Sequence, residues 1–96
     1  MNEERYIPVA GDVIVPKDGQ RTFYPDDPIE SAVGLFRSFS VPSGQPLLVV
    51  DVRTWGMFGD CRELILRLVE LDKDPPRELF YQDNEYGMKR FFDLLK

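Results

Sequence analysis

The stretch "LLVVDVRTWGMFGDCRELILRLVEL", Leu47 to Leu71, decides how the fold of this chain is predicted. Leu47 to Val52 is a continuous apolar run with Asp51 near its end, the pattern of a strand covered on both faces in a parallel sheet. Asp60 can cap a helix after this strand, with Glu63 three residues further on. Apolar residues then recur at the spacing of one helix face: Cys61, Leu64, Ile65, Leu68 and Leu71. The stretch therefore predicts a central strand, a loop and an amphipathic helix.

The flanking segments predict further strands and helices. Tyr6 to Pro16 is β-rich and, with the later "QRTFY", suggests an N-terminal hairpin across the Lys17-Asp18-Gly19 turn. "RELFYQ" predicts a short strand, and a last helix is expected from about Asn84 to Lys96, with Asp83 as a possible cap. A helix ending near Phe39 is predicted from a D-x-x-E box and one apolar face: Asp27, Pro28, Glu30, Ile29, Ala32, Val33 and Phe36.

These elements follow the order β-β-α-β-α-β-α, which indicates a small α/β domain with a mixed sheet and right-handed crossovers. A chain of 96 residues is long enough for one self-supporting core and too short for two. We therefore expect residues 1–96 to form a single α/β domain.

Composition limits the classes of partner. Twelve basic and seventeen acidic side chains give a net charge of -5, and the basic residues are scattered, so nucleic acid is not an expected partner. No apolar run approaches the roughly 20 residues of a membrane span, and the polar, acidic start "MNEERYIP" does not resemble a secretory signal. We expect a cytoplasmic protein with no membrane partner.

Catalytic chemistry has little support. The chain has no histidine, and its single cysteine stands six residues before Arg67, the C-x5-R spacing of cysteine phosphatases. The intervening "RELIL" is apolar and helix-forming, unlike a phosphate-binding loop, so Cys61 is interpreted as a buried, inert core residue. Asp51 and Asp60 have no metal or base beside them, which leaves helix capping as the role of Asp60. We expect no enzymatic activity, cofactor or metal.

The loop after the central strand has an unusual composition. Trp55, Met57 and Phe58 are three large apolar residues between or beside Gly56 and Gly59. We expect one or two of them to close the end of the core and the rest to form an exposed apolar patch of the kind that marks a partner site.

In its order of elements, and in the segments "LLVVDVRTWGMFGDCRELILRLVEL" and "RELFYQDNEYGMKRFFDLLK", the chain resembles the STAS domain of anti-sigma-factor antagonists. The resemblance implies a strand ending in Asp, a D-S-S-G-type loop whose serine or threonine is phosphorylated by a partner kinase, and a following helix. The matching positions here are Gly59, Asp60, Cys61 and Arg62, without a serine or threonine. The resemblance then implies a phosphorylation switch that is lost, or replaced by the permanent charge of Asp60.

Three function classes follow. The first is a non-enzymatic, STAS-like regulatory module that binds a regulator, kinase or toxin/effector protein through residues 54–62 and the start of the next helix. Its predicted partner-binding residues are Trp55, Met57, Phe58, Asp60 and Arg62. The alternative is a small acidic inhibitor, such as a toxin immunity or phage anti-defence protein, which uses acids including Asp26, Asp27 and Glu30 against a basic partner. The third is an enzyme or ligand binder built on Cys61 or the carboxylates, and a homodimer stays open.

Overall fold

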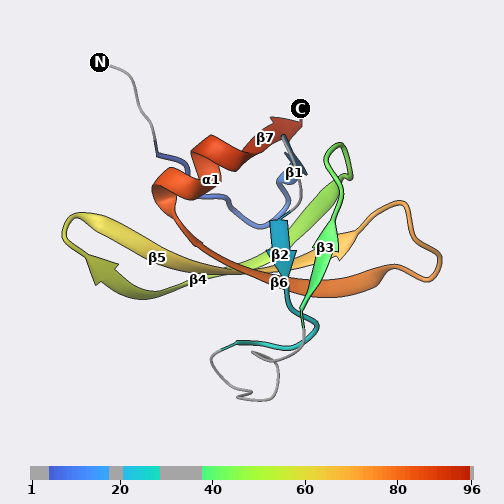
Figure 1. Cartoon of the computed structure of the whole chain (residues 1–96), viewed down its shortest axis with the longest axis horizontal. Coiled ribbons are helices and arrows are strands. Elements are labelled where there is room, and N and C mark those ends of the chain that lie inside the picture. The colour runs from blue at the N-terminus through green and yellow to red at the C-terminus, as the bar shows by residue number, and fades with distance from the viewer. Residues whose placement is uncertain (1–4, 18–20, 29–37, 96) are drawn as a thin grey trace.

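The computed structural model of the chain describes residues 5–17, 21–28 and 38–95 (Figure 1). These residues form seven strands and one short helix. In chain order they are β1 (Val13–Pro16), β2 (Arg21–Phe23), β3 (Phe39–Val41), β4 (Leu47–Phe58), β5 (Cys61–Glu70), β6 (Arg77–Asn84), α1 (Glu85–Phe91) and β7 (Phe92–Leu95).

Five strands form one sheet in the order β6-β5-β4-β1-β7, and β2 pairs with β3 in a separate two-stranded sheet. Every strand pairing in the five-stranded sheet is antiparallel. The described residues thus form a mainly-β domain, and the predicted α/β fold with the order β-β-α-β-α-β-α is wrong. The STAS resemblance is wrong for the same reason, since the described residues do not follow the STAS order of helices and strands.

The segment predicted as the second helix is the strand β5. Leu64, Leu66 and Leu68 are buried and Arg67 is exposed, which follows the two-residue period of a strand. From Glu63 to Glu70, β5 lies between β4 and β6 and is paired with both, so the backbone N-H and C=O groups of this part of the strand find partners in the sheet. The same apolar residues also fit a helical stripe, so pairing with two neighbouring strands, rather than local preference, decides the structure.

A two-residue turn, Gly59-Asp60, connects β4 to β5, because Phe58 and Cys61 are paired across it. Gly59 has φ of 65°, and no residue other than glycine among those described has a positive φ. A positive φ at the first central position alone is the pattern of a type II′ turn, whose twist matches that of antiparallel strands. The turn reverses the chain at the point where the sequence predicted a helix to begin.

One hydrophobic core joins all the described elements, since each strand and the helix contributes at least one buried residue. Phe23, Tyr81 and Phe92 form an aromatic group in this core, with ring centroids 4.9 Å apart for Phe23 and Tyr81 and 5.0 Å apart for Tyr81 and Phe92. They come from β2, β6 and β7, so their contacts pack the two-stranded sheet and β7 against β6. A backbone pair between Tyr24, the residue after β2, and Phe80 of β6 makes a second link between these parts of the chain.

The remaining predictions have mixed outcomes. The N-terminal hairpin is wrong, because β1 pairs with β4 and β7 while β2 pairs with β3. The "RELFYQ" strand is confirmed as part of β6, and the start of the last helix is confirmed, although Asn84 rather than Asp83 caps it. This helix ends at Phe91, where β7 begins, instead of continuing to the end of the chain. Most of the first predicted helix falls on residues 29–37, outside the described part of the chain.

The turn at Gly59 provides a test of this fold. Substituting Gly59→Ala should cost about 1–2 kcal/mol of stability, because a Cβ disfavours the left-handed backbone conformation. Gly56→Ala is the matched control, since Gly56 lies in β4 without a positive φ and its added Cβ meets no atom within 4 Å. Chemical denaturation of both variants measures the difference. Equal stability of the two variants would contradict the turn.

Candidate functional site

The β4–β5 hairpin extends beyond the rest of the sheet (Figure 1). Strand β1 pairs with β4 only at Leu47 and Leu48. The turn before β1 adds two backbone hydrogen bonds at Val49, from Gly11 N-H to Val49 O and from Val49 N-H to Asp12 O, both 2.8 Å. From Asp51 to Phe58, β5 is the only strand paired with β4 in the described part of the chain. Within the described part of the chain, the edge of β4 opposite β5 therefore has no neighbouring strand from Asp51 to Phe58.

The end of this hairpin presents large apolar side chains to solvent. Trp55 is 48% exposed, Met57 58% and Phe58 81%. Together with Gly56 and Glu63 they line a shallow hollow of about 380 Å³. The expectation that one or two of these three residues close the core is wrong, because none of them is buried.

Polar contacts with Arg5 and with Glu85 attach the end of the hairpin to distant parts of the chain. Arg5 donates a hydrogen bond to Asp60 Oδ2 at 2.6 Å and stacks over the Tyr86 ring, 5.1 Å from its centroid. Glu85, a buried residue of α1, accepts the Arg62 backbone N-H at 2.7 Å. These contacts fix the direction in which the hairpin leaves the core.

Asp60 is the second residue of the turn and caps no helix, so its predicted capping role is wrong. The hydrogen bond and positive charge of Arg5 stabilise the carboxylate and lower the pKa of Asp60. The same contact raises the pKa of Arg5, which keeps the pair ionised. Asp60 thus holds the N-terminal segment against the turn.

Cys61 is buried and unpaired by disulfide, as the sequence predicted, but on a strand rather than on a helix. Its Sγ lies 3.9 Å from the backbone oxygen of Arg62. Arg67 lies on the same strand, and its side chain pairs with Glu78 at 2.7 Å. The C-x5-R spacing therefore forms no loop around a phosphate.

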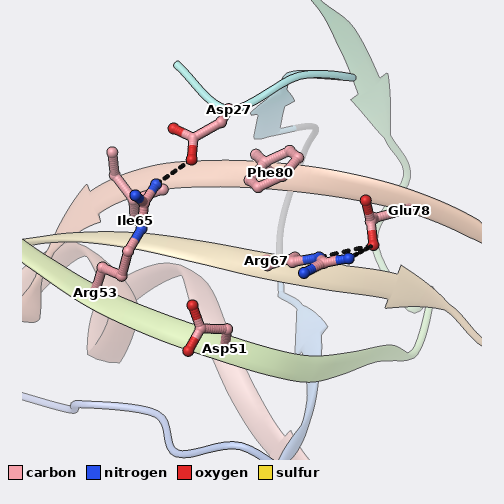
Figure 2. Close-up of a pocket in the computed structure, with 7 residues that line it drawn as sticks. All are labelled: Asp27, Asp51, Arg53, Ile65, Arg67, Glu78 and Phe80. Carbon is pink, nitrogen blue, oxygen red and sulfur yellow. Dashed lines mark hydrogen bonds and ion pairs between the residues drawn. The ribbon is translucent and has the colours of Figure 1, made fainter. Parts of the chain in front are cut away.

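A second hollow, also about 380 Å³, lies on the face of β4, β5 and β6 away from the core. Figure 2 shows an Arg53–Asp27 ion pair at one end, an Arg67–Glu78 ion pair at the other, and Phe80 between them. Asp51 reaches the hollow from β4 and has no ion pair or hydrogen bond with the described residues. Because each arginine already faces a carboxylate, the hollow offers no unneutralised pair of cations for an anionic ligand.

The described residues form neither a metal-binding cluster nor a helix that could span a membrane. No group of three or more His, Cys, Asp or Glu side chains there could hold a metal ion. None of the helices formed by the described residues has the length and apolar character that crossing a membrane requires.

No protein-family model matches the chain, and no match was found among curated proteins or solved structures.

The structure brings the five predicted partner-binding residues together. Trp55, Met57 and Phe58 lie at the end of β4, Asp60 lies in the turn, and Arg62 begins the return along β5. Sequence reasoning missed the contacts of Arg5 and Glu85 and the whole hollow of Figure 2. No local pattern signals them, because Arg5 and Asp60 are 55 positions apart.

The Arg5–Asp60 contact predicts the titration of Asp60. NMR titration should give Asp60 a pKa below the usual value of about 3.9, and Arg5→Gln should bring it back towards that value. Since the folded-state pKa is lowered, the stabilisation is complete above the unfolded-state value and is lost as pH falls through the folded-state pKa. Lys17→Gln, which removes a pair with Asp93 elsewhere, should leave Asp60 unchanged. An Asp60 pKa that ignores Arg5→Gln would show that the pair does not form in solution.

Proposed function

We propose that this chain is a non-enzymatic module that binds another protein through the tip of the β4–β5 hairpin. We define the hairpin tip as residues 54–62. The observation that carries the proposal is the exposure of Trp55, Met57 and Phe58, which line one hollow at the end of the hairpin. Large aromatic residues dominate the energy of protein interfaces, and contiguous exposed apolar surface is typical of a binding site.

The geometry of the tip supports this role. A two-residue turn and two paired strands hold the three apolar side chains in place, and Asp60 and Glu85 tie the tip to the N-terminal segment and α1. Preorganised anchors lose little conformational freedom when a partner binds, so a larger part of their contact energy contributes to affinity. Asp60 and Arg62 flank the apolar residues and supply the polar border that surrounds such anchors.

The acidic-inhibitor alternative has less support. Asp27, one of its three named acids, forms an ion pair with Arg53, and its side chain is only 17% exposed. Glu30 lies outside the described residues. A carboxylate already paired within its own chain contributes little field to attract a basic partner. The regulatory role in the STAS sense is not retained, since the fold that implied it is contradicted.

The test compares tip and control variants for both binding and stability. An affinity-tagged chain is incubated with extract of its native host, and the proteins retained by wild type, Phe58→Ala and Leu95→Ala are quantified. Leu95 is a matched control because it is an apolar residue of β7 that is 55% exposed, away from the tip. Phe58→Ala should weaken binding of the retained partner by about 1–4 kcal/mol, while its stability changes by only about 0.5 kcal/mol because the side chain is exposed.

Two results would contradict the proposal. The first is a partner retained equally by all three forms, which would place its contact elsewhere on the chain. The second is a partner lost with Asp26→Asn but kept with Phe58→Ala, which would favour the acidic-inhibitor alternative, because Asp26 is exposed and distant from the tip in sequence.

A further inference from the structure

The hollow at the end of the hairpin contains a carboxylate among apolar side chains. The described residues that line this hollow, here called the tip hollow, are Trp55, Gly56, Met57, Phe58 and Glu63. Glu63 is the charged residue among them, and it is paired across the strands with Gly56. A Cβ added to Gly56 would meet no atom within 4 Å, so the space beside Glu63, which a larger residue would fill, is open.

Glu63 has no counter-charge among the described residues. It is half-buried, and its side chain makes no ion pair or hydrogen bond with them. Arg5 is bonded to Asp60 and stacks over the Tyr86 ring, and Arg62, the residue before Glu63, does not line the tip hollow. The part of the chain that the structure describes therefore leaves the negative charge of Glu63 without a cation.

Binding of a partner at the hairpin tip changes the surroundings of this carboxylate. A protein that covers Trp55 and Phe58 also covers the hollow that they share with Glu63, and so removes water from the carboxylate. Taking a carboxylate out of water costs free energy unless a cation or hydrogen-bond donors replace the water. The partner that fits this tip is therefore one that brings a positive charge into the tip hollow.

The aromatic wall of the hollow favours one kind of cation. A cation over the face of a tryptophan ring is attracted by the ring electrons, and arginine makes this contact more often than lysine. The planar guanidinium of arginine also donates two parallel hydrogen bonds to a carboxylate, whereas the ammonium of lysine is a compact, strongly hydrated charge. Trp55 and Glu63 offer both contacts within one hollow.

We propose that the tip hollow binds an arginine side chain of the partner protein, which stacks on Trp55 and pairs with Glu63. The inference rests on the proposed function, because the hollow is lined by the same exposed apolar residues. It names the chemistry of the partner: a segment in which an arginine lies among apolar residues, which contact Met57 and Phe58. The net charge of -5 favours the approach of such a basic segment.

The test begins with peptides selected on the protein itself. Short random peptides displayed on phage are selected on immobilised wild type and, in parallel, on Glu63→Gln. The peptides enriched on wild type should carry an arginine beside apolar residues, because only such a sequence satisfies both the carboxylate and the apolar walls. The peptides enriched on Glu63→Gln should be apolar without a preference for arginine.

The strongest wild-type peptide is then synthesised and titrated. Trp55 is the only tryptophan of the chain, so its fluorescence reports binding in the tip hollow. Replacing the arginine of the peptide by citrulline, its uncharged isostere, and replacing Glu63→Gln on the protein should each weaken binding about fivefold or more. The two changes together should weaken binding by less than the product of the single effects, since both remove the same pair.

Asp51→Asn is the matched control. Asp51 is an exposed carboxylate of β4 that lines the hollow of Figure 2 and not the tip hollow, so its substitution should leave peptide binding unchanged. Circular dichroism checks that both protein variants are folded. The citrulline peptide tests the charge on unaltered wild-type protein, so this result does not depend on the folding of any variant.

The inference would be overturned by a selection on wild type that enriches no peptide or only peptides without arginine. It would also be overturned by an arginine peptide that binds as tightly with citrulline, or by one that Asp51→Asn weakens and Glu63→Gln does not. If the selected peptides lack arginine but Phe58→Ala abolishes their binding, only this inference fails and the proposed function stands. If neither the peptides nor a partner from host extract depend on Phe58, the proposed function fails as well.

Discussion

The structure depends on β5, the strand that lies between β4 and β6 in the sheet. Its residues Leu64, Leu66 and Leu68 are fully buried, and each faces the core from a strand that is paired on both sides. Burying a leucine side chain is worth about 1.5–3 kcal/mol, so this row is a large part of what stabilises a small domain. A helix over the same residues would leave β4 and β6 without their common neighbour, and the sheet would lose both pairings.

The long pairing of β4 with β5 also creates the exposed hairpin. β1 reaches β4 only at Leu47 and Leu48, whereas β5 pairs with it as far as Phe58. Within the described part of the chain, the remainder of β4 therefore has one edge without a neighbouring strand. Exposed sheet edges promote association and are usually blocked. The exposed apolar residues at the end of β4 are the feature on which the proposed binding of another protein rests.

Sequence reasoning predicted individual segments better than their arrangement. The strand beginning at Leu47, the strand at "RELFYQ", the start of the last helix and the burial of Cys61 follow from local patterns and are confirmed. The helix at Cys61–Glu70 is wrong because "LILRLV" is nearly continuous in apolar residues and satisfies the periods of both helix and strand. The pair Gly59-Asp60 was the signal for a hairpin, since Gly-Asp between two apolar runs is typical of a two-residue turn. The hollow beside Asp27 and the Arg5–Asp60 contact depend on residues brought together by the fold, so no local period contains them.

The most direct test of the fold is the pattern of NMR cross-peaks from residues 61–70, which distinguishes a strand from a helix. If β5 is a strand between β4 and β6, strong contacts should join backbone protons of Leu66 to those of Val52 on β4 and Tyr81 on β6, the residues paired with it. Sequential amide contacts and contacts between residues three apart should be weak in this segment, because its backbone is extended. Strong amide-amide and i to i+3 contacts from Cys61 to Glu70, without contacts to Val52 or Tyr81, would show a helix there and contradict the account.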